Sequence, residues 1–162
     1  MNPPADFPVA GARLRAACDA DCAALAELAR SAHSHPWSER QYRDSLEGGH
    51  ATWLLESEEG EPIACCVVSQ LFDEAEILDV AVAPAWRRRG IARALLQQVI
   101  DRLPDGTSRL LLDVRASNEA ARGLYAGLGF VEDGVRRNYY PAAGGGREDA
   151  ILMSRALQRA WQ

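Results

Sequence analysis

The segment that most constrains the fold joins an apolar run, a turn rich in arginine with one glycine, and a run of helical periodicity. The apolar run Ile77–Val82 predicts a strand, which Pro84 ends. After the turn, the run from Ala92 to Leu103 predicts a helix, because its apolar residues lie near helical spacing: Ala94, Leu95, Val99 and Leu103. The chain therefore contains a strand–turn–helix unit.

The turn itself, Arg87-Arg88-Arg89-Gly90-Ile91-Ala92, has the features of an anion site. Backbone N–H groups are unpaired at a helix N-terminus, where the helix dipole is positive. Gly90 and Ala92 allow a ligand to approach the backbone closely, whereas arginines at a helix start are disfavoured unless an anion is present. We expect a pyrophosphate here. Neither a P-loop nor the three-glycine dinucleotide fingerprint is present. The alternative is an ordinary turn with solvated arginines.

Length and charge restrict the class of protein. The chain has 162 residues, which fits a single domain over 12–162 after a flexible N-terminal lead over 1–11. Its formal net charge is −5, which argues against nucleic-acid binding and is compatible with a basic peptide or small cationic substrate. The chain has neither an apolar run of membrane-spanning length nor the pattern of a signal peptide. We therefore expect a cytoplasmic protein without a membrane partner.

The four cysteines do not predict a metal site. Cys65 and Cys66 are adjacent in an apolar strand, so their side chains point to opposite faces. In a cytosolic chain, cysteines are by default free and largely buried. The alternative is a zinc site, but the spacing of Cys18, Cys22, Cys65 and Cys66 matches none of the usual zinc-binding patterns.

The remaining periodicity predicts an α+β fold. Helices are expected over about 20–31, from Ser38 to about Leu46, and from Ser117–Asn118 to about Leu128. Strands are expected over 13–18, 51–56, 63–72, from the turn at Asp73–Glu74 to Ala83, and over 109–114, 130–139 and 147–157. This order predicts one mixed, mostly antiparallel sheet of about six or seven strands, with one parallel crossover and about four helices on its two faces.

Three segments together resemble the GNAT superfamily of N-acetyltransferases. Arg87-x-x-Gly90-x-Ala92 is similar to the family's conserved turn, and Asn118 with Leu124-Tyr125-x-x-Leu128-Gly129-Phe130 is similar to its second conserved region. Within the superfamily the chain most resembles the ribosomal-protein-alanine N-acetyltransferases (RimI type) from Arg13 onward. Five phrases carry this likeness: His35-Pro36-Trp37-Ser38-Glu39, Asp73-Glu74-Ala75, Val114-Arg115-Ala116-Ser117-Asn118, Arg136-Arg137-Asn138-Tyr139-Tyr140-Pro141 and Gly146-Arg147-Glu148-Asp149-Ala150.

The resemblance implies the GNAT fold, with its sheet splayed at the centre, and acetyl-CoA as co-substrate without a metal. It places the pantetheine arm at the backbone of Val80, Ala81 and Val82. It places the pyrophosphate at the amides of Arg87, Arg88, Arg89, Gly90, Ile91, Ala92 and Arg93. Asn118 is implied to lie near the pantetheine; its alternative role is that of a plain helix cap.

The resemblance also implies the catalytic groups. Asp113 stands where the closest family has a glutamate acting as base, so its carboxylate lies one methylene further back and a bridging water is favoured. Tyr125 is implied to be the acid that protonates the leaving thiolate; its alternative is a half-buried core aromatic. Asp79 could share or replace the role of base, and either aspartate could instead be a strand residue paired with an arginine.

For the acceptor, the resemblance implies two aromatic walls, formed by Pro36 and Trp37 and by Tyr139 and Tyr140. The alternative is aromatic packing at strand ends, with Trp37 in the core. Loop histidines are more often solvated than catalytic, so His33 and His35 are not assigned a role. Acidic residues beside the expected cleft would favour a basic peptide: Glu39, Asp73, Glu74 and Glu76.

The implied function is acetyl-CoA-dependent Nα-acetylation of a protein N-terminus, namely the N-terminal alanine of a small-subunit ribosomal protein, the eighteenth in standard naming. The acceptor is then a basic ribosomal protein, and the enzyme is expected to be a monomer. Two alternatives remain: a lysine or small-amine acetyltransferase with the same fold, and a sensor that binds acetyl-CoA without turnover.

Overall fold

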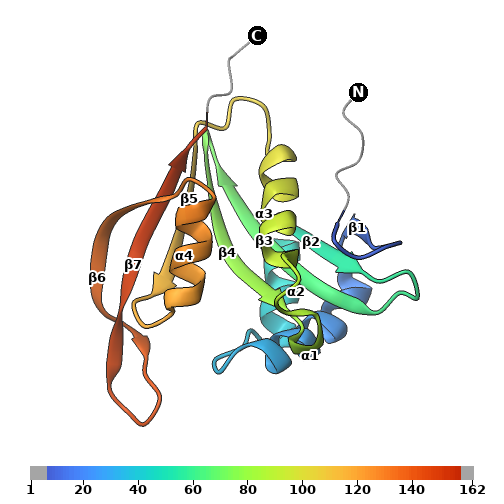
Figure 1. Cartoon of the computed structure of the whole chain (residues 1–162), viewed down its shortest axis with the longest axis horizontal. Coiled ribbons are helices and arrows are strands. Elements are labelled where there is room, and N and C mark those ends of the chain that lie inside the picture. Colours follow the sequence, from blue (N-terminus) through green and yellow to red (C-terminus); the bar gives the residue numbers. More distant parts are fainter. Residues whose placement is uncertain (1–6, 158–162) are drawn as a thin grey trace. The chain divides into compact units, whose positions relative to one another are not determined.

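A computed structural model describes residues 7–157 of the chain (Figure 1). The strands are β1 (Arg13–Ala16), β2 (Ala51–Glu56), β3 (Pro62–Leu71), β4 (Glu74–Val82), β5 (Arg109–Arg115), β6 (Val131–Pro141) and β7 (Arg147–Ala156). The helices are α1 (Cys22–Ala32), α2 (Glu39–Glu47), α3 (Ile91–Asp101) and α4 (Glu119–Gly127), with short 3-10 turns at Asp19–Asp21 and Pro84–Trp86.

The strands form a seven-stranded sheet in the order β1-β2-β3-β4-β5-β7-β6. β4 and β5 pair in parallel, whereas β1 with β2, β2 with β3, β5 with β7, and β6 with β7 pair antiparallel. This confirms the expected mixed, mostly antiparallel sheet with its parallel crossover and four helices. The splay at the centre of the sheet stays an expectation.

The described chain divides into two compact units. The first unit holds residues 7–69 and 79–103, and the second holds residues 70–78 and 104–157. Strand β4 contributes to both, because its residues up to Leu78 belong to the second unit and those from Asp79 to the first. The single domain expected over 12–162 stays a prediction.

In the first unit, α1, β2, β3 and α3 bury an apolar core. Cys65 and Cys66 are both buried although they point to opposite faces of β3, so this strand is covered on both sides. Helix α2 begins at the predicted cap: the Ser38 hydroxyl accepts a 3.1 Å hydrogen bond from the Gln41 N–H, and the Gln41 side chain accepts one of 2.8 Å from the Ser38 N–H. This capping box fixes where the segment between α1 and α2 ends.

In the second unit, β5 presents two different faces. Leu110, Leu112 and Val114 are buried on one face, and the alternate residues Asp113 and Arg115 lie part-exposed on the other. β6 and β7 form a long hairpin (Figure 1), whose register shifts between Arg136 and Tyr140. β5 therefore directs polar groups to one face of its sheet.

Element ends differ from the expectation where side chains or proline intervene. β1 ends at Ala16 instead of residue 18, because the Cys18 N–H donates to the Asp21 carboxylate and starts the turn before α1. α3 ends at Asp101 and does not reach Leu103, because Pro104 disfavours the helical conformation for the residue before it, Leu103.

Residues 1–6 of the expected N-terminal lead lie outside the described residues, and within 7–11 a turn is closed by the Ala12 N–H donating to the Val9 carbonyl at 3.2 Å. Cys18 is exposed, in contrast to the expected burial, whereas Cys22, Cys65 and Cys66 are buried free thiols. None of the helices described within residues 7–157 is long and apolar enough to cross a membrane.

Candidate active site

The turn before α3, in the first unit, has an exposed backbone. Gly90 precedes the helix with φ 73°, the left-handed region that favours glycine, and Arg88 has φ 63°. No side chain caps this helix start, and its first turn contains no acidic residue. A Cβ added at Gly90 would meet no atom of the described residues within 4 Å. An anion could therefore approach the backbone at Gly90 without displacing any described residue.

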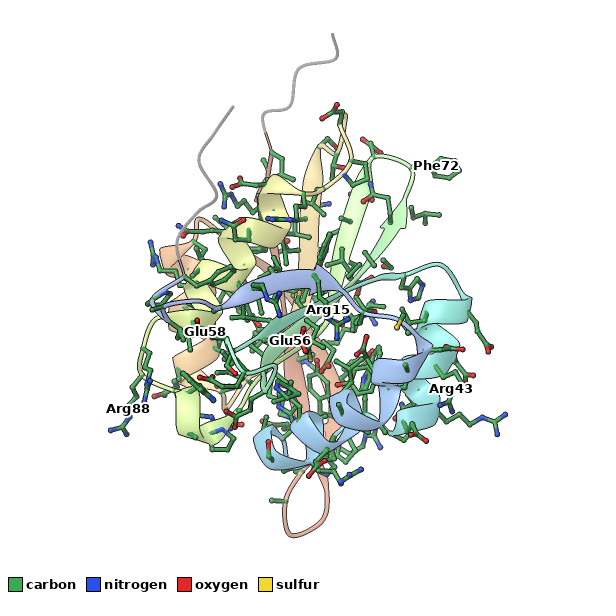
Figure 2. All side chains as sticks on the ribbon, turned by 90° about the vertical axis from the view of Figure 1, so that its right-hand side faces the viewer. Arg15, Arg43, Glu56, Glu58, Phe72 and Arg88 are labelled. Carbon is green, nitrogen blue, oxygen red and sulfur yellow. The ribbon has the colours of Figure 1, made fainter. Side chains whose placement is uncertain are left out.

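The arginines of this turn have different surroundings. The Arg87 guanidinium donates a 3.0 Å hydrogen bond to the carbonyl of Ala32, the last residue of α1. The Arg89 guanidinium lies 4.9 Å from the ring centroid of Trp86. Arg88 projects away from the ribbon (Figure 2) and has no hydrogen-bond or ion-pair partner among residues 7–157. Among these three arginines, Arg88 can therefore bind a ligand without giving up a contact to residues 7–157.

Strand β4 ends in the three residues expected at the pantetheine. Ala81 is buried, whereas Val80 and Val82 are partly exposed. The N–H of Ala83, the next residue, donates to the Ile63 carbonyl of β3 at 2.8 Å. The contact of this segment with the coenzyme stays a prediction.

Asp79, one residue before that segment, is surrounded by His33, which follows α1, and by side chains of α2 and β3. Its Oδ2 accepts a 2.6 Å hydrogen bond from the Tyr42 hydroxyl, and its Oδ1 lies 3.6 Å from His33 Nε2. Burial raises the pKa of Asp79, while the Tyr42 hydrogen bond and the His33 charge act in the opposite direction. Burial likewise raises the pKa values of Tyr42 and of the neighbouring thiol of Cys65. Both carboxylate oxygens thus have partners inside the first unit.

In the second unit, Asp113 of β5 is close to Glu76 of β4. In the parallel register Glu76 is opposite Leu111, so Glu76 and Asp113 point to the same face of the sheet. Burial first, and the Asp113 charge second, raise the pKa of Glu76, whereas Arg136 lowers it. Neither carboxylate has a hydrogen-bond or ion-pair partner among the described residues. A proton acceptor is therefore available on this face.

Strand β6 of the second unit carries an aromatic pair near its end. Tyr139 and Tyr140 contact edge to face, with ring centroids 4.9 Å apart. The Arg115 guanidinium lies 4.5 Å from the Tyr140 ring and forms a 2.9 Å ion pair with Glu148. Burial first, then the Asp113 charge, raises the pKa of Tyr140 to about 12. The structure thus brings Tyr140 close enough to Asp113 for the charge of Asp113 to act on its hydroxyl, while the roles of both residues stay predictions.

Helix α4 and its N-cap carry the two other expected residues of the second unit. The Tyr125 ring is part-exposed and meets the Phe130 ring edge to face, at 5.7 Å between centroids. The Asn118 side chain accepts a 3.1 Å hydrogen bond from the Ala121 N–H, so Asn118 caps the helix, as its alternative role predicts. A further contact of Asn118 with pantetheine and the acid role of Tyr125 stay predictions.

Pro36 and Trp37 lie in the segment between α1 and α2, and both are partly exposed. The Trp37 ring packs on Tyr42, with centroids 5.2 Å apart. Sequence reasoning missed Tyr42, a buried aromatic whose position on the apolar side of a polar helix could have signalled its packing role. Acceptor binding by Pro36 and Trp37 stays a prediction.

The acidic residues expected beside the cleft are mostly paired within their own units. The Asp73 carboxylate accepts a 2.7 Å hydrogen bond from Ser108. Glu74 lies 3.5 Å from Arg109, and Glu39 lies 3.9 Å from Arg43. Of these four residues Glu76 alone keeps an unpaired carboxylate among the described residues, so the acidic character that remains is concentrated beside Asp113.

Residues 7–157 contain no group of three or more His, Cys, Asp or Glu side chains arranged to hold a metal ion. The expectation that the reaction needs no metal stays a prediction.

Comparison with known proteins shows what the chain is similar to. Residues 22–130 match the sequence profile described as the Acetyltransferase (GNAT) family. The Escherichia coli (strain K12) protein named ribosomal protein bS18-alanine N-acetyltransferase is 41% identical over 135 residues, which are 83% of this chain and 90% of that protein.

Solved structures agree with the sequence comparison. The crystal structure of the ribosomal-protein-S18-alanine N-acetyltransferase from Escherichia coli has a TM-score of 0.84 at 36% identity and covers 93% of this chain and 97% of that one. A GNAT superfamily phosphinothricin acetyltransferase from Sinorhizobium meliloti, solved in complex with acetyl-CoA, has a TM-score of 0.75 at 22% identity and covers 91% and 89%. This second likeness concerns the fold alone.

Proposed function

The chain belongs to the GNAT family of acetyltransferases, and we propose that it transfers the acetyl group of acetyl-CoA to the N-terminal α-amino group of a protein, namely the N-terminal alanine of ribosomal protein bS18. One observation carries the choice of acceptor: the 41% identity, over 83% of this chain, to an enzyme named for that alanine. The acceptor is then a ribosomal protein, and the reaction takes place in the cytoplasm with the enzyme as a monomer.

The coenzyme site is assigned to the first unit. The start of α3 suits a pyrophosphate because it lacks a side-chain cap and faces open space at Gly90. The amides of residues 87–93 would hold the phosphates with Arg88 as a free cation, and the backbone of Val80–Val82 would hold the pantetheine arm. When bound, acetyl-CoA supplies an acetyl group activated as a thioester.

Proton transfer is assigned to residues of the second unit. An α-ammonium group has a reference pKa of about 7.7–8.0, so a weak base suffices to deprotonate it. The Asp113 carboxylate takes this proton, directly or through one water, and the amine nitrogen then bonds to the thioester carbonyl carbon. As the carbon–sulfur bond breaks, the Tyr125 hydroxyl gives its proton to the thiolate and regains one from solvent.

An acceptor panel tests this function. We expect acetylation of a peptide that begins Ala-Arg, and none of the same peptide with a blocked N-terminus or of a blocked peptide with an internal lysine. Mass spectrometry of the products identifies the modified nitrogen. Efficient acetylation of the blocked or lysine peptide would instead identify a side-chain amine acetyltransferase, and coenzyme binding without thiol release on any amine would identify a sensor.

A further inference from the structure

Asp79 is a buried carboxylate that the proposed proton transfers do not use. It lies on β4 directly before the pantetheine segment, and its side chain is 8% exposed. One carboxylate oxygen accepts a 2.6 Å hydrogen bond from the Tyr42 hydroxyl, and the other lies 3.6 Å from His33 Nε2. Both oxygens contact partners inside the first unit. This geometry suits a structural role better than that of a base that accepts a proton from a substrate.

The partners of Asp79 lie at the two ends of one segment, residues 33–37. His33 directly follows α1, so its contact with Asp79 fastens the start of the segment to β4. Tyr42 is 1% exposed and packs against Trp37, with ring centroids 5.2 Å apart, so it fastens the end of the segment. Asp79 therefore holds the start of this segment through His33 and its end through Tyr42.

A buried carboxylate is unfavourable unless its partners compensate for lost hydration. Burial raises the pKa of Asp79, whereas Tyr42 and His33 favour its charged form. The Arg87 guanidinium adds a contact at the same place, because it donates to the carbonyl of Ala32, which precedes His33. The junction of α1 with the 33–37 segment is thus held by polar groups from β4 and from the turn before α3.

We propose that Asp79 is a positioning residue for acceptor binding: through His33 and Tyr42 it holds residues 33–37 in the conformation in which Pro36 and Trp37 contact the acceptor peptide. This inference rests on the proposed function in one respect, that this segment contacts the acceptor. It assigns Asp79 a role different from that of Asp113, since Asp79 acts on where the acceptor binds and not on its proton.

Steady-state kinetics of the full chain test the proposal. Asp79→Asn should raise the KM for the Ala-Arg peptide about tenfold, as expected for one hydrogen bond to a charged group, with kcat and the KM for acetyl-CoA within about twofold of wild type. Tyr42→Phe should act in the same direction, and the double variant should be less than additive because both residues act through one contact. Asp44→Asn is the matched control, because Asp44 is exposed on α2 and pairs with Arg40.

Hydrogen exchange gives a readout that does not require activity. Asp79→Asn and the milder His33→Gln, at a side chain 36% exposed, should speed amide exchange in residues 33–37 and leave α3 unchanged. Unchanged exchange in that segment would overturn the proposal, as would a fall in kcat with an unchanged peptide KM, which would identify Asp79 as a base. If the wild type acetylates no peptide N-terminus, the proposed function fails, while the exchange measurement still decides whether Asp79 positions the segment.

Discussion

At the scale of single residues, Tyr125 is the side chain whose assignment depends most on chemistry. Its ring packs edge to face on Phe130 and is part-exposed, and a phenylalanine at this position keeps that ring contact. We expect Tyr125→Phe to lower kcat about a hundredfold, the usual contribution of a general acid, with acetyl-CoA affinity unchanged. Stopped-flow measurement of thiol release, with calorimetry of coenzyme binding, checks this. Near wild-type turnover with chemistry rate-limiting would mean that water protonates the thiolate.

Asp113 allows a prediction with a defined pH dependence. An acceptor amine that is already deprotonated needs no base, and its reference pKa is about 7.7–8.0. Asp113→Asn should therefore lower kcat/KM most at neutral pH, and the deficit should shrink as pH rises above that range. The control is Glu148→Gln on the same face, whose carboxylate is paired with Arg115. A deficit that is constant across pH would show that Asp113 positions the acceptor and does not remove its proton.

At the scale of elements, a substitution in the turn before α3 can distinguish the effect of local backbone strain from the effect of a lost ligand contact. A valine at Gly90 would have a strained backbone at φ 73°, yet its Cβ would meet no other atom of residues 7–157 within 4 Å. We expect Gly90→Val to weaken acetyl-CoA binding at least tenfold by calorimetry while the fold persists. Gly49→Val is the matched control, because Gly49 also has a positive φ and open surroundings but lies after α2. Equal coenzyme affinities in the two variants would refute a role for the turn.

The first strand gives an element-scale prediction about stability. Arg15 of β1 contacts Asp21 at 2.8 Å and Glu56 of β2 at 2.6 Å (Figure 2 shows Arg15 beside Glu56). The hydrogen bond from Arg15 holds the pKa of Asp21 well below its usual value. A lowered carboxyl pKa stabilises the fold at neutral pH, and this stabilisation is lost as pH falls below the unfolded value of about 3.9 towards the folded one.

Asp21→Asn should therefore lower the free energy of unfolding by about 1 kcal/mol at pH 7, a value kept small because the Arg15 side chain is 40% exposed. Urea titrations at neutral pH and near pH 3 should show that the difference from wild type narrows in acid. The exposed Asp44→Asn change is the control. A difference that persists unchanged in acid would mean that geometry, and not the charge of Asp21, is what matters.

Local signals predicted most of the elements, because caps, prolines and periodicity act within a few residues. Ser38 begins α2 as expected, and Gly90 precedes α3. The environment of Asp79 could not be predicted, because its partners come from the residue after α1 and from α2 and meet β4 only in the folded unit. The ion pair of Glu74 with Arg109 could not be predicted from the sequence either, since it depends on the parallel register that sets these two residues opposite each other.

At the scale of the whole molecule, charge should influence the choice of acceptor only weakly. The net charge of −5 attracts a basic peptide at long range. Among the acidic residues expected to recognise it, Asp73, Glu74 and Glu39 already have partners, and Glu76 is unpaired among the described residues. Attraction by one such carboxylate and by the diffuse charge is screened over about 10 Å at 0.1 M salt.

We therefore expect the KM of an Ala-Arg peptide to rise about twofold to threefold as ionic strength increases from about 0.05 to 0.5 M, with kcat unchanged. An Ala-Ala peptide of equal length, without a basic second residue, should show almost no change, and Glu76→Gln should flatten the response of the Ala-Arg peptide. A steeper dependence that survives Glu76→Gln would mean that several carboxylates act together, and that the pairs with Ser108, Arg109 and Arg43 open when the peptide binds. An equal change of KM with ionic strength for both peptides would show that the enzyme does not recognise the charge of the second residue. Selectivity would then rest on the small first residue.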